Sequence, residues 1–252
     1  MRDDVPIQSV STGLKILEML VNRGEMTLSE LRRVMDMPKS TVHDYLTTLT
    51  ASGYVIKNDG RYRASTRCLE LGVSVRGSMQ LFRLAKPEID SLAEETAEHA
   101  SLMIEEQGVG VLLYIARGER ALNLGVSEGY RMRLPTNAPG KAILARMPRS
   151  KVERILDRHG LPQLTEATIT DREELYERLE TVQDQGYALD LGERVEGVRA
   201  VSVPITTRNE VHGAITLSGT TNRMQEEQLT GTLPDLLAQS TDDIEVQYTL
   251  KN

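Results

Sequence analysis

The first 64 residues show three apolar repeats at helical spacing, followed by two short strand-like runs. The first repeat predicts a helix from Val10 to Asn22, which Gly24 is placed to end. The apolar positions expected to form its buried stripe are Leu14, Ile16, Leu17, Leu20 and Val21.

Two further helices follow closely. Thr27 and Glu30 have the spacing of a capping box, in which each side chain bonds the backbone N–H of the other, and the helix after them should stop near Met35. Pro38 suits the first turn of a third helix, because that turn has no partner for a backbone N–H. The buried stripe of this helix is predicted to be Val42, Tyr45, Leu46 and Leu49, and Gly53 is placed to end it.

A hairpin completes this region. Two β-prone runs, residues 54–57 and 61–64, flank Asn58-Asp59-Gly60, and Asp-Gly is typical of a two-residue turn with positive φ. Three short helices and a hairpin predict a winged helix-turn-helix.

Residues 66–98 have a helical pattern, with Pro87 expected to mark a break or bend. This stretch is a candidate for an interdomain linker and a dimer contact, and the alternative is that its first half packs on its own domain. The strand-like runs beyond it are 101–106, 109–117, 121–127, 187–190, 198–206 and 212–218, and the helical ones are 140–147, an acidic region to about 185, and 225–249. The expected fold class is α+β, with a mixed α/β domain around one sheet behind the winged helix.

Charge is unevenly distributed over the chain. The net charge is −7, yet residues 1–75 carry ten Lys/Arg against nine Asp/Glu, so the acidic excess lies in the remainder. This distribution fits a DNA-binding module joined to a domain that repels DNA. The single cysteine, Cys68, the lack of a bilayer-spanning apolar run and the acidic N-terminus favour a cytoplasmic protein without a membrane partner.

The candidate DNA contacts lie on the exposed face of the third helix and on the hairpin. The helix offers Lys39, Ser40, Thr41, His43, Asp44 and Thr47, and the hairpin offers Lys57, Arg61 and Arg63. An ordinary solvated surface is the alternative for each of them. Asp44 would be repelled by phosphates, although it can accept from a cytosine amino group or pair with a basic neighbour.

The chemistry expected of an enzyme is missing from the sequence. The histidines at 43, 99, 159 and 212 have no metal-ligand spacing, and Cys68 has no histidine close by in the sequence to activate it. No nucleophile elbow, phosphate-binding loop or dinucleotide fingerprint occurs. We therefore expect no catalysis, no metal and no cofactor.

At this point the chain resembles the IclR family of regulators. The motifs that carry the resemblance are Pro38-Lys39-Ser40-Thr41-Val42-His43, Gly53-Tyr54-Val55, Leu69-Glu70-Leu71-Gly72, Pro139-Gly140-Lys141-Ala142, Thr168-Ile169-Thr170-Asp171, Gly186-Tyr187-Ala188-Leu189-Asp190 and Leu217-Ser218-Gly219. They are spread in order over essentially the whole chain.

The resemblance implies a winged helix-turn-helix over 1–66, a linker helix over 67–86 and a GAF-like effector-binding domain over 87–252. It also implies a homodimer or tetramer that acts on a double-stranded DNA operator. Two positions depart from the family pattern: Asp44 stands where Arg is usual, and Ala200 where Cys is frequent in the effector pocket.

A candidate effector pocket follows from the residues and the resemblance together. The loop of Asn137, Ala138, Pro139 and Gly140 leads into a helix, and free backbone N–H groups there would favour a carboxylate. Asp190 could accept from a hydroxyl, and Thr216 and Ser218 share one strand face. By resemblance these positions and Ala200 line the cavity, with Leu124 and Val126 as its apolar wall. The alternative makes Thr216 and Ser218 satisfied core hydroxyls and Asp190 a cap or ion-pair partner.

The sequence therefore predicts a DNA-binding repressor that senses a small metabolite, an organic acid with a hydroxyl being our hypothesis. One alternative is an effector-independent DNA-binding protein whose C-terminal domain serves dimerisation or protein contact. Another is a sensor whose helix-turn-helix contacts protein. The sequence leaves open the operator, the effector and the sign of regulation.

Overall fold

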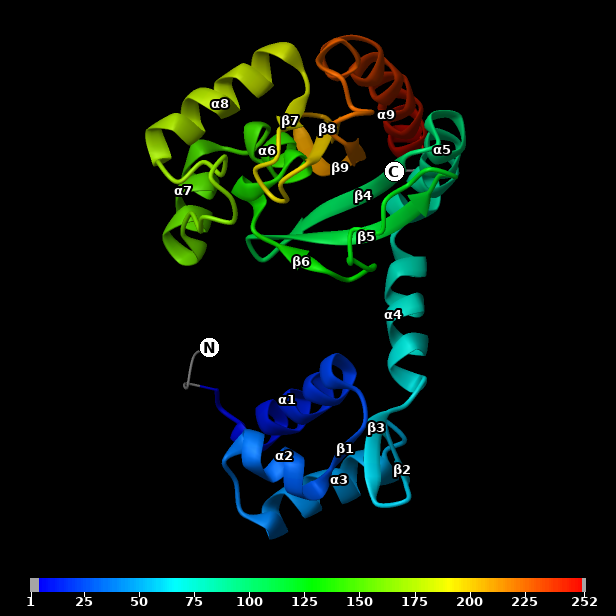
Figure 1. The fold of residues 1–252 in the computed structure, drawn as a ribbon, viewed down its shortest axis with the longest axis vertical. Coiled ribbons are helices and arrows are strands. Elements are labelled where there is room, and N and C mark those ends of the chain that lie inside the picture. The colour runs from blue at the N-terminus through cyan, green and yellow to red at the C-terminus, as the bar shows by residue number, and fades with distance from the viewer. Residues whose placement is uncertain (1–4, 251–252) are drawn as a thin grey trace. The chain divides into compact units, whose positions relative to one another are not determined.

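The computed structural model describes residues 5–250, which separate between Ser78 and Met79 into two compact units. The first is a winged helix-turn-helix and the second is built around one six-stranded sheet, so the α+β class is confirmed (Figure 1). None of the helices in residues 5–250 is both long enough and apolar enough to cross a membrane.

The first unit consists of three helices, a small sheet and a fourth helix. Its sheet has the antiparallel order β1-β3-β2. The elements are α1 (Gln8–Arg23), β1 (Met26–Thr27), α2 (Leu28–Met35), α3 (Lys39–Ala51), β2 (Val55–Asn58), β3 (Arg61–Ala64) and α4 (Arg67–Ser78).

Local sequence signals account for most of this unit. Thr27 Oγ1 accepts from Glu30 N at 3.2 Å and Glu30 Oε2 accepts from Thr27 N at 2.7 Å, so the predicted capping box is confirmed. Asp59 and Gly60 have φ of 46° and 78° between β2 and β3, as a two-residue hairpin turn requires. Strand β1, whose two residues pair with β3, was not predicted from the sequence.

The predicted stripe of α1 is partly wrong. The buried residues are Thr12, Ile16 and Leu20, whereas Leu14 and Val21 are 56% and 57% exposed. At about 100° per residue, Leu14 lies roughly 200° around the helix from Ile16, so the two cannot share one buried face. The apolar periodicity therefore located the helix correctly but included residues from two of its faces.

The linker region also differs from the prediction of one helix over 67–86. Two helices occupy it, because α4 ends at Ser78, Met79 is extended (φ −73°, ψ 119°), and α5 spans Gln80–Thr96. Pro87 lies inside α5 rather than at a break. Proline removes one backbone hydrogen bond there, and the buried apolar face of α5, including Leu84 and Ile89, packs well enough to maintain the helix.

The second unit contains an antiparallel sheet of order β6-β5-β4-β9-β8-β7 with helices on both faces. After α5 its elements are β4 (His99–Glu106), β5 (Val109–Arg117), β6 (Arg131–Met132), a 3₁₀ turn (Leu134–Thr136), α6 (Ala138–Ala145), α7 (Arg149–His159), α8 (Arg172–Gln185), β7 (Ala188–Asp190), β8 (Val198–Thr207), β9 (Glu210–Thr220), a π turn (Gln228–Thr232) and α9 (Leu233–Leu250).

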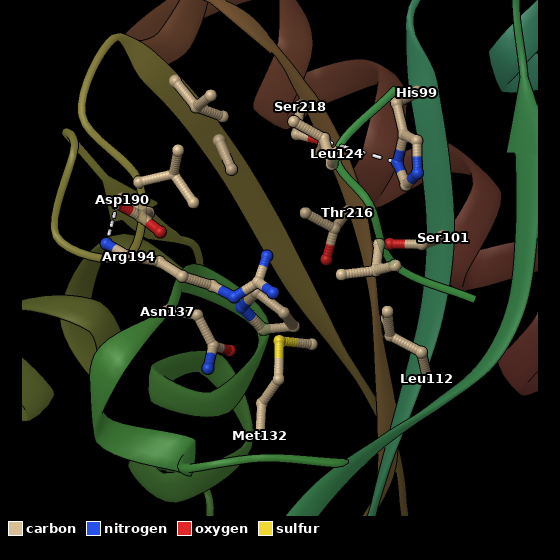
Figure 2. A pocket seen from close by; sticks show the side chains of 15 residues that line it. His99, Ser101, Leu112, Leu124, Met132, Asn137, Asp190, Arg194, Thr216 and Ser218 are labelled. Atoms are coloured by element: carbon tan, nitrogen blue, oxygen red, sulfur yellow. Dashed lines mark hydrogen bonds between the residues drawn. The ribbon is translucent and has the colours of Figure 1, made fainter. Parts of the chain in front are cut away.

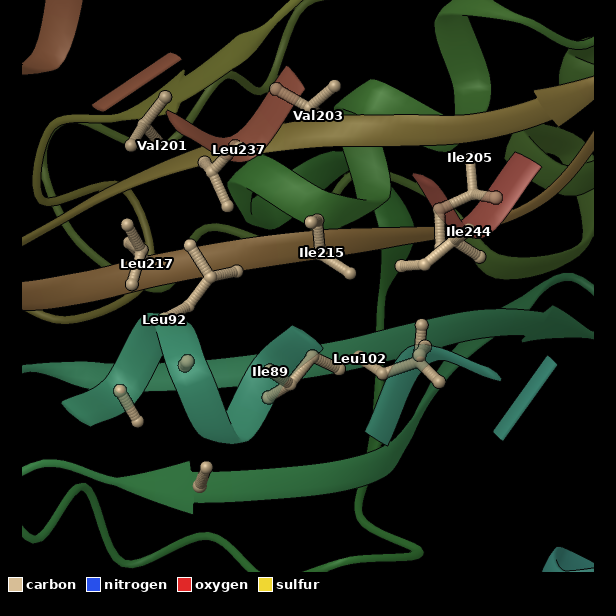
Figure 3. Close-up of a cluster of buried hydrophobic side chains, with 14 of the residues drawn as sticks. Ile89, Leu92, Leu102, Val201, Val203, Ile205, Ile215, Leu217, Leu237 and Ile244 are labelled. Atoms are coloured by element: carbon tan, nitrogen blue, oxygen red, sulfur yellow. The ribbon is translucent and has the colours of Figure 1, made fainter. Parts of the chain in front are cut away.

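Two cores lie on opposite faces of this sheet. On one face α5 and α9 cover an aliphatic cluster that includes Ile89, Leu102, Ile215 and Leu237 (Figure 3). On the other face α6, α7 and α8 pack over a second cluster, which includes Met103 and Ile143. The sheet is thus covered on both sides, and the polar residues enclosed with it need partners.

The strand expected over 121–127 is absent, because the segment is a loop. Gly125 has φ of 65° and its amide bonds Asn123 Oδ1, which breaks the extended conformation that a strand needs. Strand β5 pairs instead with the short edge strand β6, Gly110 opposite Met132. Leu124 and Val126 still turn inward, so the alternation in the sequence reflects burial without strand pairing.

Candidate nucleic-acid interface and ligand cavity

The outward face of α3 carries polar side chains because its opposite face is anchored in the core. Val42 and Leu46 are fully buried, which leaves Lys39 and Ser40 exposed in the first turn. The other predicted contacts on this helix, Thr41, His43, Asp44 and Thr47, are exposed or partly exposed. Residues 39–41 form the first turn, whose backbone N–H groups have no helical partner and favour an anion.

Two of these side chains have local partners. The Thr47 hydroxyl donates to the His43 carbonyl at 2.8 Å, so its proton is already used. His43 Nδ1 lies 3.8 Å from Asp44 Oδ1. The carboxylate that departs from the family pattern is therefore placed beside an imidazole on the same exposed face.

The three basic residues of the hairpin differ in how free they are. Arg61 donates to the Glu25 carbonyl at 2.9 Å and lies within 4 Å of the Glu25 and Glu30 carboxylates. Arg63 Nε is 3.7 Å from Glu25 Oε1. Lys57 lies over the Tyr62 ring at 5.5 Å and has no acidic partner in residues 5–250. Thus two of the three positive charges on the β2–β3 hairpin, which forms the wing, are partly neutralised within the protein.

The second unit contains a partly open cavity of about 50 Å³ between β4, β8, β9 and the start of α6 (Figure 2). One water needs about 10–15 Å³ on this measure, so the space suits a small molecule. The lining residues are His99, Ser101, Leu112, Leu124, Val126, Met132, Asn137, Pro139, Asp190, Arg194, Val195, Val198, Ala200, Thr216 and Ser218.

Most of the predicted pocket residues meet there. Of the ten, Leu124, Val126, Asn137, Pro139, Asp190, Ala200, Thr216 and Ser218 line the cavity, and Ala138 and Gly140 do not. Strand register explains part of this gathering, because Ser218 stands opposite both His99 and Ala200. Alternate residues of a strand share a face, so a row of small polar side chains borders the space.

The start of α6 offers fewer free N–H groups than the sequence suggested. The Asn137 side chain caps the helix, its Oδ1 accepting from Gly140 N at 2.9 Å, and Pro139 has no N–H. Gly140 serves packing, since a Cβ there would lie 1.9 Å from the Leu134 carbonyl oxygen. Within the described chain, the Ala138 amide is the one group of this turn left without a protein acceptor.

The strand hydroxyls have protein partners. Thr216 Oγ1 is 2.9 Å from Ser202 Oγ, and Ser218 Oγ is 3.4 Å from His99 Nδ1. Both hydroxyls fit the alternative of satisfied core groups, although each still lines the cavity and has a further lone pair.

Asp190 acts as a loop cap. Its Oδ1 accepts from the backbone amides of Gly192, Glu193 and Arg194, at 3.1, 2.7 and 3.4 Å. Burial raises the pKa of Asp190 to about 6, and the ammonium of Lys141 opposes that rise. This geometry fits the cap that the sequence left open as the alternative to a ligand contact.

A buried ion pair fixes the same loop. Lys141, fully buried in α6, contacts the Glu193 carboxylate, and burial lowers the pKa of Lys141 while Glu193 opposes the shift. The hydroxyls of Thr165 and Thr168 donate to the Glu193 carbonyl at 3.1 and 2.6 Å. The loop backbone that carries Arg194 is therefore fixed by the Asp190 cap, by the Lys141–Glu193 ion pair and by the two threonine hydroxyls.

Sequence reasoning missed three polar lining residues, His99, Ser101 and Arg194. Arg194 extends from the fixed loop into the cavity (Figure 2), and its guanidinium lies 5.6 Å from the Tyr130 ring. Burial lowers the pKa of His99 to about 4, with a smaller contribution from Arg117. The available signal was the alternation of His99 and Ser101 with apolar Ala100 and Leu102 in one strand.

Comparison with known proteins gives a consistent result over the whole chain. Residues 9–59 match the IclR helix-turn-helix domain, and residues 73–246 match the domain described as bacterial transcriptional regulator IclR C-terminal. The chain is 33% identical over 247 residues to the probable HTH-type transcriptional regulator ArcR of Halobacterium salinarum, which covers 96% of this chain and 94% of ArcR. It is 31% identical to the HTH-type transcriptional regulator XynR of Escherichia coli, over 88% of this chain and 90% of XynR.

Solved structures agree in fold. The Thermotoga maritima IclR superposes with a TM-score of 0.81 at 26% identity, covering 95% of this chain and 98% of that one. An IclR homologue from Microbacterium hydrocarbonoxydans, solved with 4-hydroxybenzoate, has a TM-score of 0.81 at 24% identity, over 94% and 98% of the two chains. With both domains matched in order, this chain belongs to the IclR family of transcriptional regulators.

Proposed function

We propose that the protein is a sequence-specific DNA-binding repressor whose second unit senses a small organic acid. The observation that carries the proposal is the pairing of an exposed α3 face in one unit with a cavity of mixed polar and apolar lining in the other. The partners would be a double-stranded operator and a small-molecule effector. A homodimer on a twofold-repeated site is the expected assembly, acting in the cytoplasm without catalysis.

DNA binding is assigned to α3 and the wing. Lys39 and Ser40 offer an exposed ammonium, a hydroxyl and the unpaired amides of the first helical turn to a backbone phosphate. Thr41 and His43 are the base-reading candidates further along the helix. Lys57 is the least neutralised of the wing cations and would contribute most of the wing's phosphate attraction.

Effector binding is assigned to the cavity. Its walls combine apolar side chains such as Leu112 and Met132 with polar ones such as Asn137 and Arg194, a mixture typical of small-molecule sites. The homologue solved with 4-hydroxybenzoate supports the view that this fold can hold a carboxylate. The choice of an organic acid rests on Arg194, which is the one cation among the described residues that line the cavity. The pKa of His99 is lowered to about 4, so its ring is neutral at pH 7.

The experiment is fluorescence anisotropy of the protein on a duplex from its own upstream region, over a salt series and against a scrambled duplex. Lys39→Ala should weaken binding about tenfold and reduce the salt slope by about 1. The matched control is Arg154→Ala, which removes one exposed positive charge from α7 of the second unit and should change neither quantity.

The same assay tests sensing and its sign. Adding small carboxylates should lower the operator affinity if the protein is a repressor released by its effector. A protein that binds the operator but ignores every carboxylate would fit the effector-independent alternative. Equal binding to both duplexes, insensitive to Lys39→Ala, would reject α3 as the reading element.

A further inference from the structure

His99 carries a buried polar atom that the fold leaves without a partner. The side chain is 3% exposed, and its Nδ1 lies 3.4 Å from the Ser218 hydroxyl. Its Nε2 has no hydrogen-bond partner among the described residues, although the ring borders the cavity (Figure 2). Buried polar atoms are nearly always satisfied, so an orphaned one on a ring that lines a cavity indicates a group that arrives from outside the protein.

The imidazole at this position is neutral. Its burial, with Arg117 and Arg194 nearby, holds the pKa of His99 at about 4. A neutral ring offers one N–H and one lone pair, and Ser218 can act as donor or acceptor toward Nδ1. Nε2 is therefore suited to a hydroxyl or a carbonyl oxygen and provides nothing for an apolar group.

Arg194, unlike the neutral imidazole of His99, brings a positive charge to the cavity. Its guanidinium has no ion-pair partner in residues 5–250, and it reaches the cavity from a loop fixed by Asp190 and by the Lys141–Glu193 pair. Asp190 directs Oδ1 to the loop amides and so leaves the guanidinium free. A planar guanidinium with several parallel N–H donors is matched to a carboxylate.

We propose that Arg194 and His99 are the specificity-determining residues of the cavity: Arg194 binds the effector carboxylate and His99 Nε2 hydrogen-bonds a hydroxyl or carbonyl oxygen elsewhere on the same molecule. The ligand class is a short oxygen-substituted carboxylate, because Arg194 suits a carboxylate, His99 suits an oxygen, and the cavity volume of about 50 Å³ favours a small molecule. This inference rests on the proposed function, because it assumes that the cavity is the effector site.

Matched ligand sets test the two contacts separately. Isothermal titration of the full chain would use 2-hydroxy acids of three to five carbons, together with their deoxy carboxylates and their amides. For wild type we expect the deoxy acids to bind at least tenfold more weakly, since they leave Nε2 unpaired, and the neutral amides to show no binding.

Variants assign each preference to its residue. Arg194→Gln should weaken the hydroxy acids at least thirtyfold while keeping their advantage over the deoxy acids. His99→Leu should abolish that advantage with little change for the deoxy acids. His99→Gln, which places an amide near the Nε2 position, should restore part of it and provides a second variant should the leucine disturb folding.

The outcomes separate this inference from the proposed function. Hydroxy and deoxy acids that bind wild type equally, or hydroxy acids that bind both folded variants as they bind wild type, would overturn the roles of His99 and Arg194 and leave sensing intact. If no acid of any set binds wild type or changes its operator affinity in the anisotropy assay, both the inference and organic-acid sensing fail, while DNA binding stands on its own measurement.

Discussion

The two units of this regulator carry the side chains proposed for binding in opposite ways. In the first, Lys39 and Lys57 lie on the surface, supported by a core of eight buried apolar residues. In the second, Asp190, His99 and Thr216 are buried between two larger cores, and each has protein partners. Surface contacts can therefore change without cost to the fold, whereas a change at one of these buried cavity groups also changes the stability of its unit.

The largest expected effect comes from a substitution that should disrupt one unit alone. Gly140→Ala places a Cβ 1.9 Å from the Leu134 carbonyl oxygen, where backbone must move, and should destabilise the second unit by about 3 kcal/mol. In calorimetry we expect the transition of that unit to fall while the transition of the first unit stays in place.

The matched control for this prediction is Gly72→Ala in α4, where a Cβ meets nothing within 4 Å and alanine favours the helix. A change below about 1 kcal/mol is expected there. If Gly140→Ala lowered both transitions together, the two units would be thermodynamically coupled and the comparison would no longer hold.

The next effect is on the pH dependence of stability, to which the cavity groups Asp190 and His99 contribute with opposite sign. The pKa of Asp190 is raised to about 6, so its contribution to stability is present below the unfolded pKa near 3.8 and is lost as pH rises through 6. The pKa of His99 is lowered to about 4, so its contribution is present above 6.5 and is lost as pH falls through 4. At about 1.4 kcal/mol per pH unit, each is worth up to roughly 3 kcal/mol, and the two nearly cancel between pH 4 and 6.

A single substitution at either residue should reveal the pH dependence of stability that the other residue contributes. In urea unfolding, Asp190→Asn should become more stable as pH rises from 4 to 6, because the histidine slope remains alone. His99→Gln should lose stability over the same interval. Parallel pH profiles for wild type and both variants would mean that neither group titrates in this range.

The DNA-binding unit should show smaller effects, confined to its surface. Glu25 contacts both Arg61 and Arg63, so Glu25→Gln should free two wing cations and strengthen operator binding about threefold, with a steeper salt dependence. Glu18→Gln removes the same charge from an exposed position of α1 and is the control. Equal gains from both variants would indicate a general charge effect and no specific release of the wing.

The smallest effect concerns a helix cap. Thr27→Ala removes the capping box of α2 and should lower the stability of the first unit by about 1 kcal/mol. Thermal unfolding followed by circular dichroism would measure it, with Thr50→Ala on the exposed side of α3 as reference. An undetectable change at Thr27 would mean that pairing of β1 with β3 alone fixes the start of α2.

The sequence predicted these two regions unequally. The capping box and the Asp59-Gly60 turn depend on neighbours within four residues, so local pattern was enough. The cavity depends on which strands lie side by side, and nothing local places His99 opposite Ser218. Asp190 and Thr216 were predicted only through family resemblance. Arg194 was missed, because its position depends on the contact of the preceding Glu193 with Lys141, which is distant in the sequence.

The Lys141–Glu193 pair also bears on how this cavity can diversify. Replacing either partner alone leaves a buried charge without its counterpart, a loss of about 3–5 kcal/mol, so the two positions can change only together. Arg194, one residue further, carries no such constraint in the described chain. The pair thus fixes the backbone of the loop while the side chain at position 194 can differ. Under the proposed contact between Arg194 and the effector, one substitution there would change ligand preference without a change in the loop backbone.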